Sequence, residues 1–206
     1  NANDVSVSVV VNQITWNNAG GNATWNLNTT ANFRLSDDSA NTNFFVGDHV
    51  TLGNLVAGGT ITVTGTVMPS SLTFDSTSNY TLQTGSIGGG ATILKKNTGI
   101  LTLSAANTHT GSTTISQGDL RIGNVNSVGS SSVTVNDENT GSANTSFVAS
   151  AALNGINGNV VVTNNGTGTV TLGSNAGQTG LVVYNGTFDL GKAVTFNGSS
   201  DRTTFS

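Results

Sequence analysis

The 206 residues are enough for one large domain or two small ones, and they carry a formal net charge of −4 with only 8% charged side chains. Six basic residues in an acidic chain do not provide the basic footprint that nucleic-acid binding requires. The chain has no Cys, which excludes disulfides and thiolate metal sites, and no apolar run reaches the about 18 residues of a membrane span.

The composition predicts an all-β protein. Gly, Asn and Thr dominate, Pro occurs once, and Val, Ile and Thr suit a pleated, half-buried surface. Gly or Asn interrupts every candidate window of about 11 residues with helical spacing.

The first predicted element, at residues 5–11, is apolar and alternating, and has the form of a strand that could add to the edge of another sheet. We assign residues 1–59 to an N-terminal β-rich segment or cap and residues 60–206 to a β-helical repeat region. Predicted strands in the second part occupy residues 60–67, 71–74, 80–83, 92–94, 100–103, 113–116, 119–122, 132–135, 159–163, 168–172, 181–184, 187–190 and 193–196. The turns between them consist of Gly, Asn, Ser and Thr.

Two architectures fit this spacing: an antiparallel β-sandwich and a right-handed parallel β-helix, or β-solenoid. Stacked coils place like residues about 4.8 Å apart, where Asn and Thr ladders are stabilising and charge ladders repel. The low charge therefore favours the β-helix.

Residues 97–124, NTGILTLSAANTHTGSTTISQGDLRIGN, resemble the passenger-associated repeat of bacterial autotransporters, also called the autotransporter-associated β-strand repeat. The family pattern is G-x-L-T-L-x-G-x-N-T-Y-T-G-x-T-x-I-x-x-G-x-L-x-x-G. The chain matches it at Gly99, Leu101, Leu103, Asn107, Thr108, Thr110, Gly111, Thr113, Ile115, Gly118, Leu120 and Gly123. It departs at His109, where Tyr is usual, and at Ala105 and Ala106, where a Gly is usual.

An upstream segment, ITWNNAGGNATWNLNTTANF followed by VGDHVTL, resembles the Trp-rich segment that often precedes such repeats, with Phe33 in place of the last Trp. The resemblance implies a right-handed parallel β-helix outside a bacterial cell, in which the repeat assists export and folding. It also implies that Leu101, Leu103, Thr113, Ile115, Leu120 and Ile122 point inward. Asn107, Gly111 and Gly118 would then form the corners.

Candidate catalytic groups are sparse. Among ten carboxylates only two pairs are adjacent, Asp37–Asp38 and Asp137–Glu138. Neighbours on a strand face opposite ways, so adjacency suits a solvated turn better than an acid and base pair. His49 and His109 have no ligand-spaced partner. We therefore predict no enzyme, and assign no catalytic, cofactor-binding or metal residue and no cofactor.

Trp16 and Trp25 have two interpretations. Exposed Trp side chains can serve as platforms that stack on carbohydrate, whereas buried ones would cap the N-terminal end of a solenoid. The cap is the favoured interpretation.

These observations predict a non-enzymatic, extracellular structural protein of a bacterial cell surface: a stalk, sheath or self-assembling fibre subunit, with adhesion as an added role. The alternative is a carbohydrate-binding or carbohydrate-cleaving β-helix. No obvious cap follows the last predicted strands, so expected partners are a second copy end to end or the continuation of a longer solenoid. A cell-surface glycan or host receptor is a further candidate partner, and we expect neither nucleic-acid binding nor membrane insertion.

Overall fold

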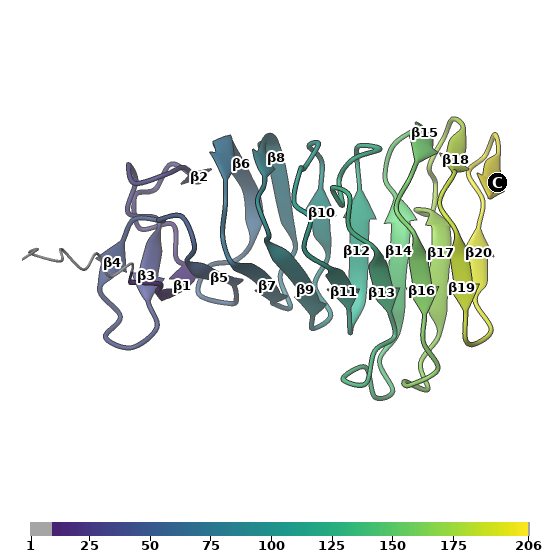
Figure 1. Cartoon of the computed structure of the whole chain (residues 1–206), viewed down its shortest axis with the longest axis horizontal. Coiled ribbons are helices and arrows are strands. Elements are labelled where there is room, and N and C mark those ends of the chain that lie inside the picture. The colour runs from purple at the N-terminus through teal and green to yellow at the C-terminus, as the bar shows by residue number, and fades with distance from the viewer. Residues whose placement is uncertain (1–9, 206) are drawn as a thin grey trace, which may run out of the picture.

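The computed structural model describes residues 10–205, which form a parallel β-helix with no α-helix in that range (Figure 1). Short strands stack along one long axis, from the purple N-terminal end to the yellow C-terminal end. Within the described range there is therefore no helix that could cross a membrane. The all-β and parallel β-helix predictions are confirmed.

One long side of the β-helix is a ten-stranded sheet. Its strands are β1 (Gln13–Trp16), β3 (Phe33–Leu35), β4 (Asn41–Thr42), β5 (His49–Leu52), β7 (Ser71–Asp75), β9 (Thr92–Lys96), β11 (Thr113–Ile115), β13 (Val133–Val135), β16 (Val160–Val162) and β19 (Phe188–Leu190). From β5 to β19 they pair in parallel and in chain order, each with the strand of the same sheet from the coil before it.

A second side is an eight-stranded sheet, whose strands all pair in parallel. It contains β2 (Thr24–Trp25), β6 (Gly59–Val67), β8 (Tyr80–Ile87), β10 (Leu101–Leu103), β12 (Gly118–Ile122), β14 (Thr145–Ala149), β17 (Val170–Ser174) and β20 (Thr195–Asn197). The third side has strands only toward the C-terminal end, namely β15 (Leu153–Ile156), β18 (Val182–Tyr184) and β21 (Thr203–Phe205).

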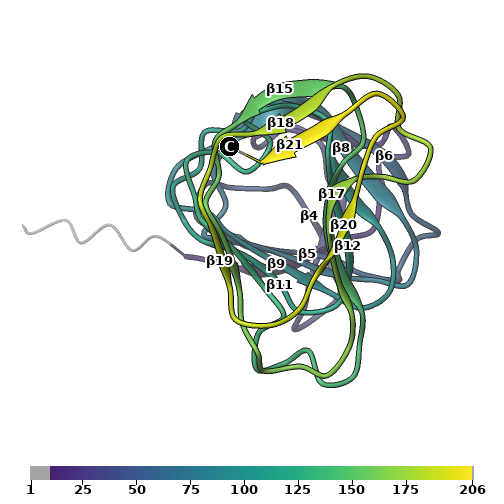
Figure 2. The same ribbon diagram turned by 90° about the vertical axis from the view of Figure 1, so that its right-hand side faces the viewer.

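The coil is right-handed. Figure 2 looks along the axis from the C-terminal end, and the chain passes from β19 on the left through β20 on the right to β21 at the top. This path is counterclockwise while the chain advances toward the viewer, which defines a right-handed turn. It is also the hand that parallel crossover connections nearly always take.

Antiparallel pairing is confined to the N-terminal end. There β3 pairs antiparallel with both β1 and β4, while β1 also pairs in parallel with β5. All other pairings among the described strands are parallel, so the antiparallel β-sandwich, the alternative prediction, is wrong.

The core is a stack of inward side chains. In β10, Leu101 and Leu103 are buried and Thr102 is half-buried, and the same alternation recurs in β11, β13 and β16. Parallel register places Leu101 between Tyr80 and Leu120, so each layer packs on a like layer of the next coil. This is the period of two that a half-buried strand requires.

All thirteen strands predicted after residue 60 are present, with ends shifted by a few residues. The sequence did not indicate β1 to β5, β14, β15 or β21. In β14 all five residues are buried, so no alternation marks the strand. The short β2 and β4 contain two residues each, too few to show a period.

The predicted strand at residues 5–11 lies outside the described residues except for Val10 and Val11, which belong to no strand. The division at residue 60 remains a prediction. The parallel ladders run across it, because β5 pairs with β7 and β2 pairs with β6.

Candidate functional site

The segment that resembles the passenger repeat belongs to two consecutive coils in the middle of the β-helix, because its strands β10 and β12 pair directly with each other. Its strands β10, β11 and β12 pair with strands of both the preceding and the following coil. The six side chains expected to point inward are fully or almost fully buried: Leu101, Leu103, Thr113, Ile115, Leu120 and Ile122. This part of the site was therefore predictable from the pattern of residues.

Asn107 ties three coils together at a corner. Its Oδ1 accepts a hydrogen bond from the backbone N–H of Ile87 at 2.8 Å, and its Nδ2 donates to the carbonyl of Ser127 at 2.6 Å. Each partner lies 20 residues away, one coil earlier and one coil later. The side chain is 6% exposed, so these bonds satisfy backbone groups that water would not reach.

His109 lies in the same connection between β10 and β11 as Asn107 and is completely buried. Its Nε2 lies 3.4 Å from Oγ1 of Thr113, which in turn lies 3.1 Å from Oγ of Ser131. Burial lowers the pKa of His109 from 6.5 to about 4, because a charged imidazole would lose its hydration. The histidine therefore packs as a neutral ring, which matches the aromatic residue usual at this position.

Lys95 lies at the end of β9, before the turn to β10, and its side chain is buried inside the β-helix. Its Nζ donates to the carbonyls of Lys96 at 3.0 Å, Asn97 at 2.6 Å and Gln117 at 2.8 Å, and it lies 4.7 Å from the ring centroid of Phe74. Burial lowers the pKa of Lys95 to about 8, against the attraction of Asp119 and Asp75. The ammonium group thus stabilises a bend whose carbonyls point inward.

At two positions of the repeat only glycine fits, because a Cβ atom would clash with neighbouring atoms. A Cβ on Gly111 would lie 2.4 Å from the carbonyl oxygen of Ala91. Gly118 has a φ of +71°, and a Cβ there would meet Nζ of Lys95 at 2.7 Å. Both positions belong to the repeat pattern, and the structure supplies the steric reason.

Both acidic pairs lie in loops. Asp37 and Asp38 lie in the exposed turn after β3, where the Asp37 carboxylate accepts the backbone N–H of Asp38. Asp137 likewise accepts hydrogen bonds within its own loop, from Asn139 and Thr140. Within residues 10–205 no three His, Asp or Glu side chains gather closely enough to hold a metal ion.

The tryptophans lie in the core and not on the surface. Trp16 is 2% exposed and Trp25 is completely buried. Phe33 packs edge-on against both indoles at centroid distances of 5.2 and 5.6 Å, and Phe44 packs against Trp25 at 5.4 Å. The stacking-platform interpretation is therefore wrong. The aromatic cluster closes the N-terminal end of the described β-helix, as the cap interpretation requires.

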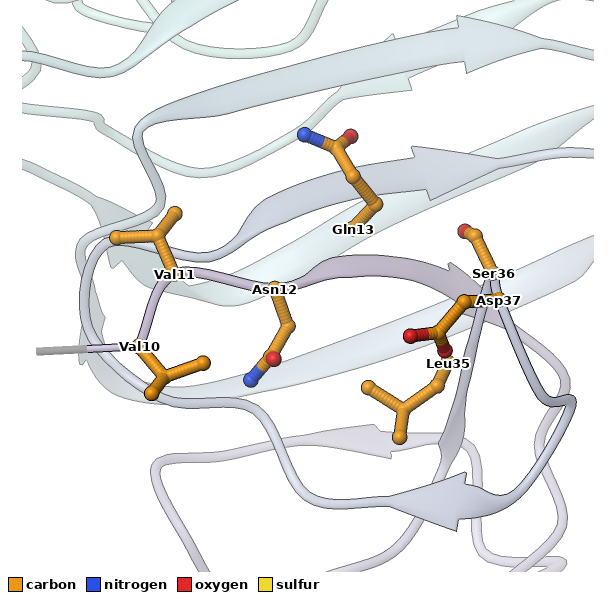
Figure 3. Close-up of a pocket in the computed structure, with 7 residues that line it drawn as sticks. All are labelled: Val10, Val11, Asn12, Gln13, Leu35, Ser36 and Asp37. Atoms are coloured by element: carbon orange, nitrogen blue, oxygen red, sulfur yellow. The ribbon is translucent and has the colours of Figure 1, made fainter.

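One hollow, of about 460 Å³, lies at the N-terminal end (Figure 3). It is lined by residues 10–13, which lead into β1, and by residues 35–37, which follow β3. Val10, Val11 and Leu35 give it apolar walls, and Asp37 is its single ionisable group.

A second hollow, of about 250 Å³, opens on the outer face of the eight-stranded sheet. It is lined by Asp119, Arg121, Ser146, Val148, Thr171, Asn175, Ala176 and Asn197. The sequence shows Asp119 and Arg121 two residues apart, hence on one face of a strand. It does not show Ser146, 27 residues later, beside them, and we did not predict this site.

Comparison with known proteins gives one positive result. Residues 88–122 match the family model described as Passenger-associated-transport-repeat. No curated protein and no solved structure matches the chain. The matched residues contain Lys95, Asn107, His109, Gly111 and Gly118, which form the corners described above. The two coils at residues 88–122 therefore correspond to a passenger-associated transport repeat, and the predicted resemblance to autotransporter passengers is confirmed.

Proposed function

We propose that this chain is part of the passenger of a secreted bacterial protein and serves as a non-catalytic structural rod on the cell surface. One observation carries the proposal. The matched repeat is not an appended module but forms two consecutive coils, β9 with β10 and β11 with β12, within continuous parallel ladders that pair on both sides. A repeat of passenger domains that is integral to the rod makes the rod itself the passenger.

The distribution of ionisable groups supports a structural role. The passenger-associated repeat is not a recognised enzyme family. In the described part of the chain, ion pairs are limited to Lys96 with Asp75 and Arg121 with Asp119, both at 3.3 Å and on different sheets. The carbohydrate-cleaving alternative needs two carboxylates flanking one bond, and neither hollow described above has them.

Coil-on-coil stacking is the proposed mode of assembly. The coil formed by β19, β20 and β21 contributes Phe188, Phe196 and Phe205, whose rings pack together at centroid distances of 4.5 to 6.4 Å. Phe196 remains 45% exposed. A further coil, from the same protein or from a second copy, would cover this aromatic layer and pair with the open edges of the three strands.

Export provides the test. The chain is placed between a secretion signal and a translocating β-barrel domain in a Gram-negative host, and protease accessibility is measured on intact cells. We expect a folded, protease-resistant rod at the surface. The Gly111→Ala variant should lower the surface yield, because its Cβ would meet the Ala91 carbonyl at 2.4 Å.

Gly90→Ala is the matched control within the same repeat, because no atom lies within 4 Å of a Cβ at that position. It should be exported like the unmodified chain. Retention of the unmodified chain inside the cell, or equal export of both glycine variants, would contradict the proposed role. Negative-stain microscopy over a concentration series then distinguishes filaments from separate rods.

A further inference from the structure

The hollow on the eight-stranded sheet is formed by the register of its last four strands. Pairing of β12, β14, β17 and β20 brings one row of outward positions into line: Arg121, Val148, Gly173 and Asn197. A neighbouring row contains Asp119, Ser146, Thr171 and Thr195. Gly173 has no side chain, so the first row is interrupted between Val148 and Asn197, and the polar groups around the gap face a recess.

The floor of the hollow is deep for an outer face. Ser146 is 8% exposed and Val148 is 3% exposed, although both alternate with the inward residue Phe147. Val148 is not part of the core cluster that contains Phe147. The walls therefore rise above β14, and a molecule in the hollow would contact side chains on several sides.

The ionisable groups in the hollow are held in place. Oδ1 of Asp119 accepts a hydrogen bond from Oγ of Ser146 at 2.7 Å, and Oδ2 lies 3.3 Å from a terminal nitrogen of Arg121. The buried Nε of Arg121 has no hydrogen-bond partner among the described residues. A buried guanidinium N–H without an acceptor is costly unless a ligand or water satisfies it.

We propose that this hollow binds one neutral sugar ring of a glycan. The carboxylate of Asp119 and the guanidinium of Arg121 neutralise each other, so the hollow has no net charge that would attract an anion or a cation. A carboxylate only accepts and a guanidinium only donates, whereas each sugar hydroxyl can do both. The amides of Asn175 and Asn197 add donors and acceptors at the rim.

Size and chemistry limit the ligand further. A volume of about 250 Å³ lies below the roughly 300–1,000 Å³ of pockets for drug-sized ligands, so the part of a ligand that enters the hollow is about one ring in size. Val148 and Ala176 provide apolar contact for the C–H face of the ring. Asp119 is the only carboxylate in the hollow, so the site binds and does not cleave.

The proposal goes beyond the structural role and does not depend on it. Asp119 and Arg121 lie on the last strand of the matched repeat, but they occupy its outward positions. The inward Leu120 and Ile122 form the coil. Binding and coil formation therefore depend on different side chains and can be separated by mutation.

The test is an NMR titration of the isotope-labelled chain with methyl glycosides of glucose, galactose, mannose and N-acetylglucosamine, and with glucuronate as the charged probe. For at least one neutral glycoside we expect millimolar binding, with shifts confined to residues 119–121, 146–148, 171–176 and 197. Asp119→Asn should weaken binding about tenfold or more, because it removes a charged hydrogen-bond acceptor. Ala176→Leu should weaken it by filling the hollow from an exposed turn, without altering a hydrogen bond.

Asp75→Asn is the matched control, because Asp75 forms the other ion pair on a different sheet. It should bind like the unmodified chain. Absence of shifts at the hollow with every neutral glycoside would overturn the proposal. Shifts with glucuronate alone would also overturn it, in favour of an anion site. If Asp119→Asn fails to fold, as circular dichroism would show, unaltered binding by a folded Ala176→Leu variant would overturn it.

Discussion

The imidazole of His109 lies with Nε2 3.4 Å from Oγ1 of Thr113, and both side chains are completely buried within the passenger-associated repeat. The hydrogen-bond partner of the imidazole is the neutral hydroxyl of Thr113, which would not offset the cost of burying a charged ring. The corner therefore tolerates a neutral ring and resists a charged one, which makes the repeat sensitive to acid.

Acid should destabilise the protein through His109. The pKa is lowered from 6.5 to about 4 on folding, so the unfolded chain binds a proton that the folded chain excludes. Stability contributed by this group is complete above pH 6.5 and is lost as the pH falls toward 4. The loss amounts to about 3 kcal/mol for a shift of this size. Denaturant unfolding between pH 4 and 7 measures it.

The His109→Phe variant should lose most of this acid dependence while keeping the packing of the ring. His49→Gln serves as the control, because His49 is only half-buried, with Nδ1 2.8 Å from Oγ of Ser71. Equal acid slopes for His109→Phe and the unmodified chain would contradict the assignment.

Lys95 should show a pH dependence of the same sign as His109, but in the alkaline range. Its pKa is lowered from 10.5 to about 8 in the folded chain, so the unfolded chain holds more protons between these values. The contribution of Lys95 to stability therefore rises with pH through that window. Burial also raises the pKa of Tyr80 and Tyr184, but these residues are present in both the unmodified chain and Lys95→Met. The difference between the two proteins therefore isolates the contribution of Lys95.

At neutral pH, Lys95→Met should itself be destabilising by about 2 kcal/mol or more, since three inward carbonyls lose their donor. Chemical denaturation at pH 7 and pH 10 gives both numbers. A free-energy difference between the two proteins that does not change with pH would argue against a buried, titrating ammonium.

The side chain of Asn107 should contribute strongly to the free energy of unfolding. Replacement by Ala removes a donor and an acceptor for buried backbone groups of the two neighbouring coils, at a cost of about 2 kcal/mol. Asn126→Ala is the matched control, because Asn126 is exposed. Thermal melts should separate the two variants by several degrees, and coincident melts would refute the corner role.

The N-terminal cluster should behave as a core. Trp25→Ala deletes an indole packed against Phe33 and Phe44 and should cost about 3–5 kcal/mol. The chain has two Trp, both buried, so native fluorescence should be blue-shifted and poorly quenched by acrylamide. Strong quenching in the native state would mean that an indole is exposed after all.

Much of the architecture was accessible from the residues. Alternation such as Leu101–Thr102–Leu103 predicts a half-buried strand because the side-chain period of a strand is two. The sparse charge indicates stacked coils, because like charges would repel between layers. The glycines and Asn107 of the repeat predict corners, because only certain residues satisfy tight bends.

The features that the sequence did not predict depend on the register between residues about one coil apart. Strand β14 is buried on both faces, so its sequence has no alternation to detect. The burial of Trp16 and Trp25 follows from the antiparallel strand β3, which brings Phe33 onto both indoles.

The sequence by itself determined an all-β chain, the inward face of most strands and the position of the passenger-associated repeat, because these depend on short-range periodicity. Only the tertiary structure decided which side chains meet across coils. Asp119 reaches Ser146, and Gly173 leaves a gap beside them, because parallel pairing aligns residues that local sequence does not relate.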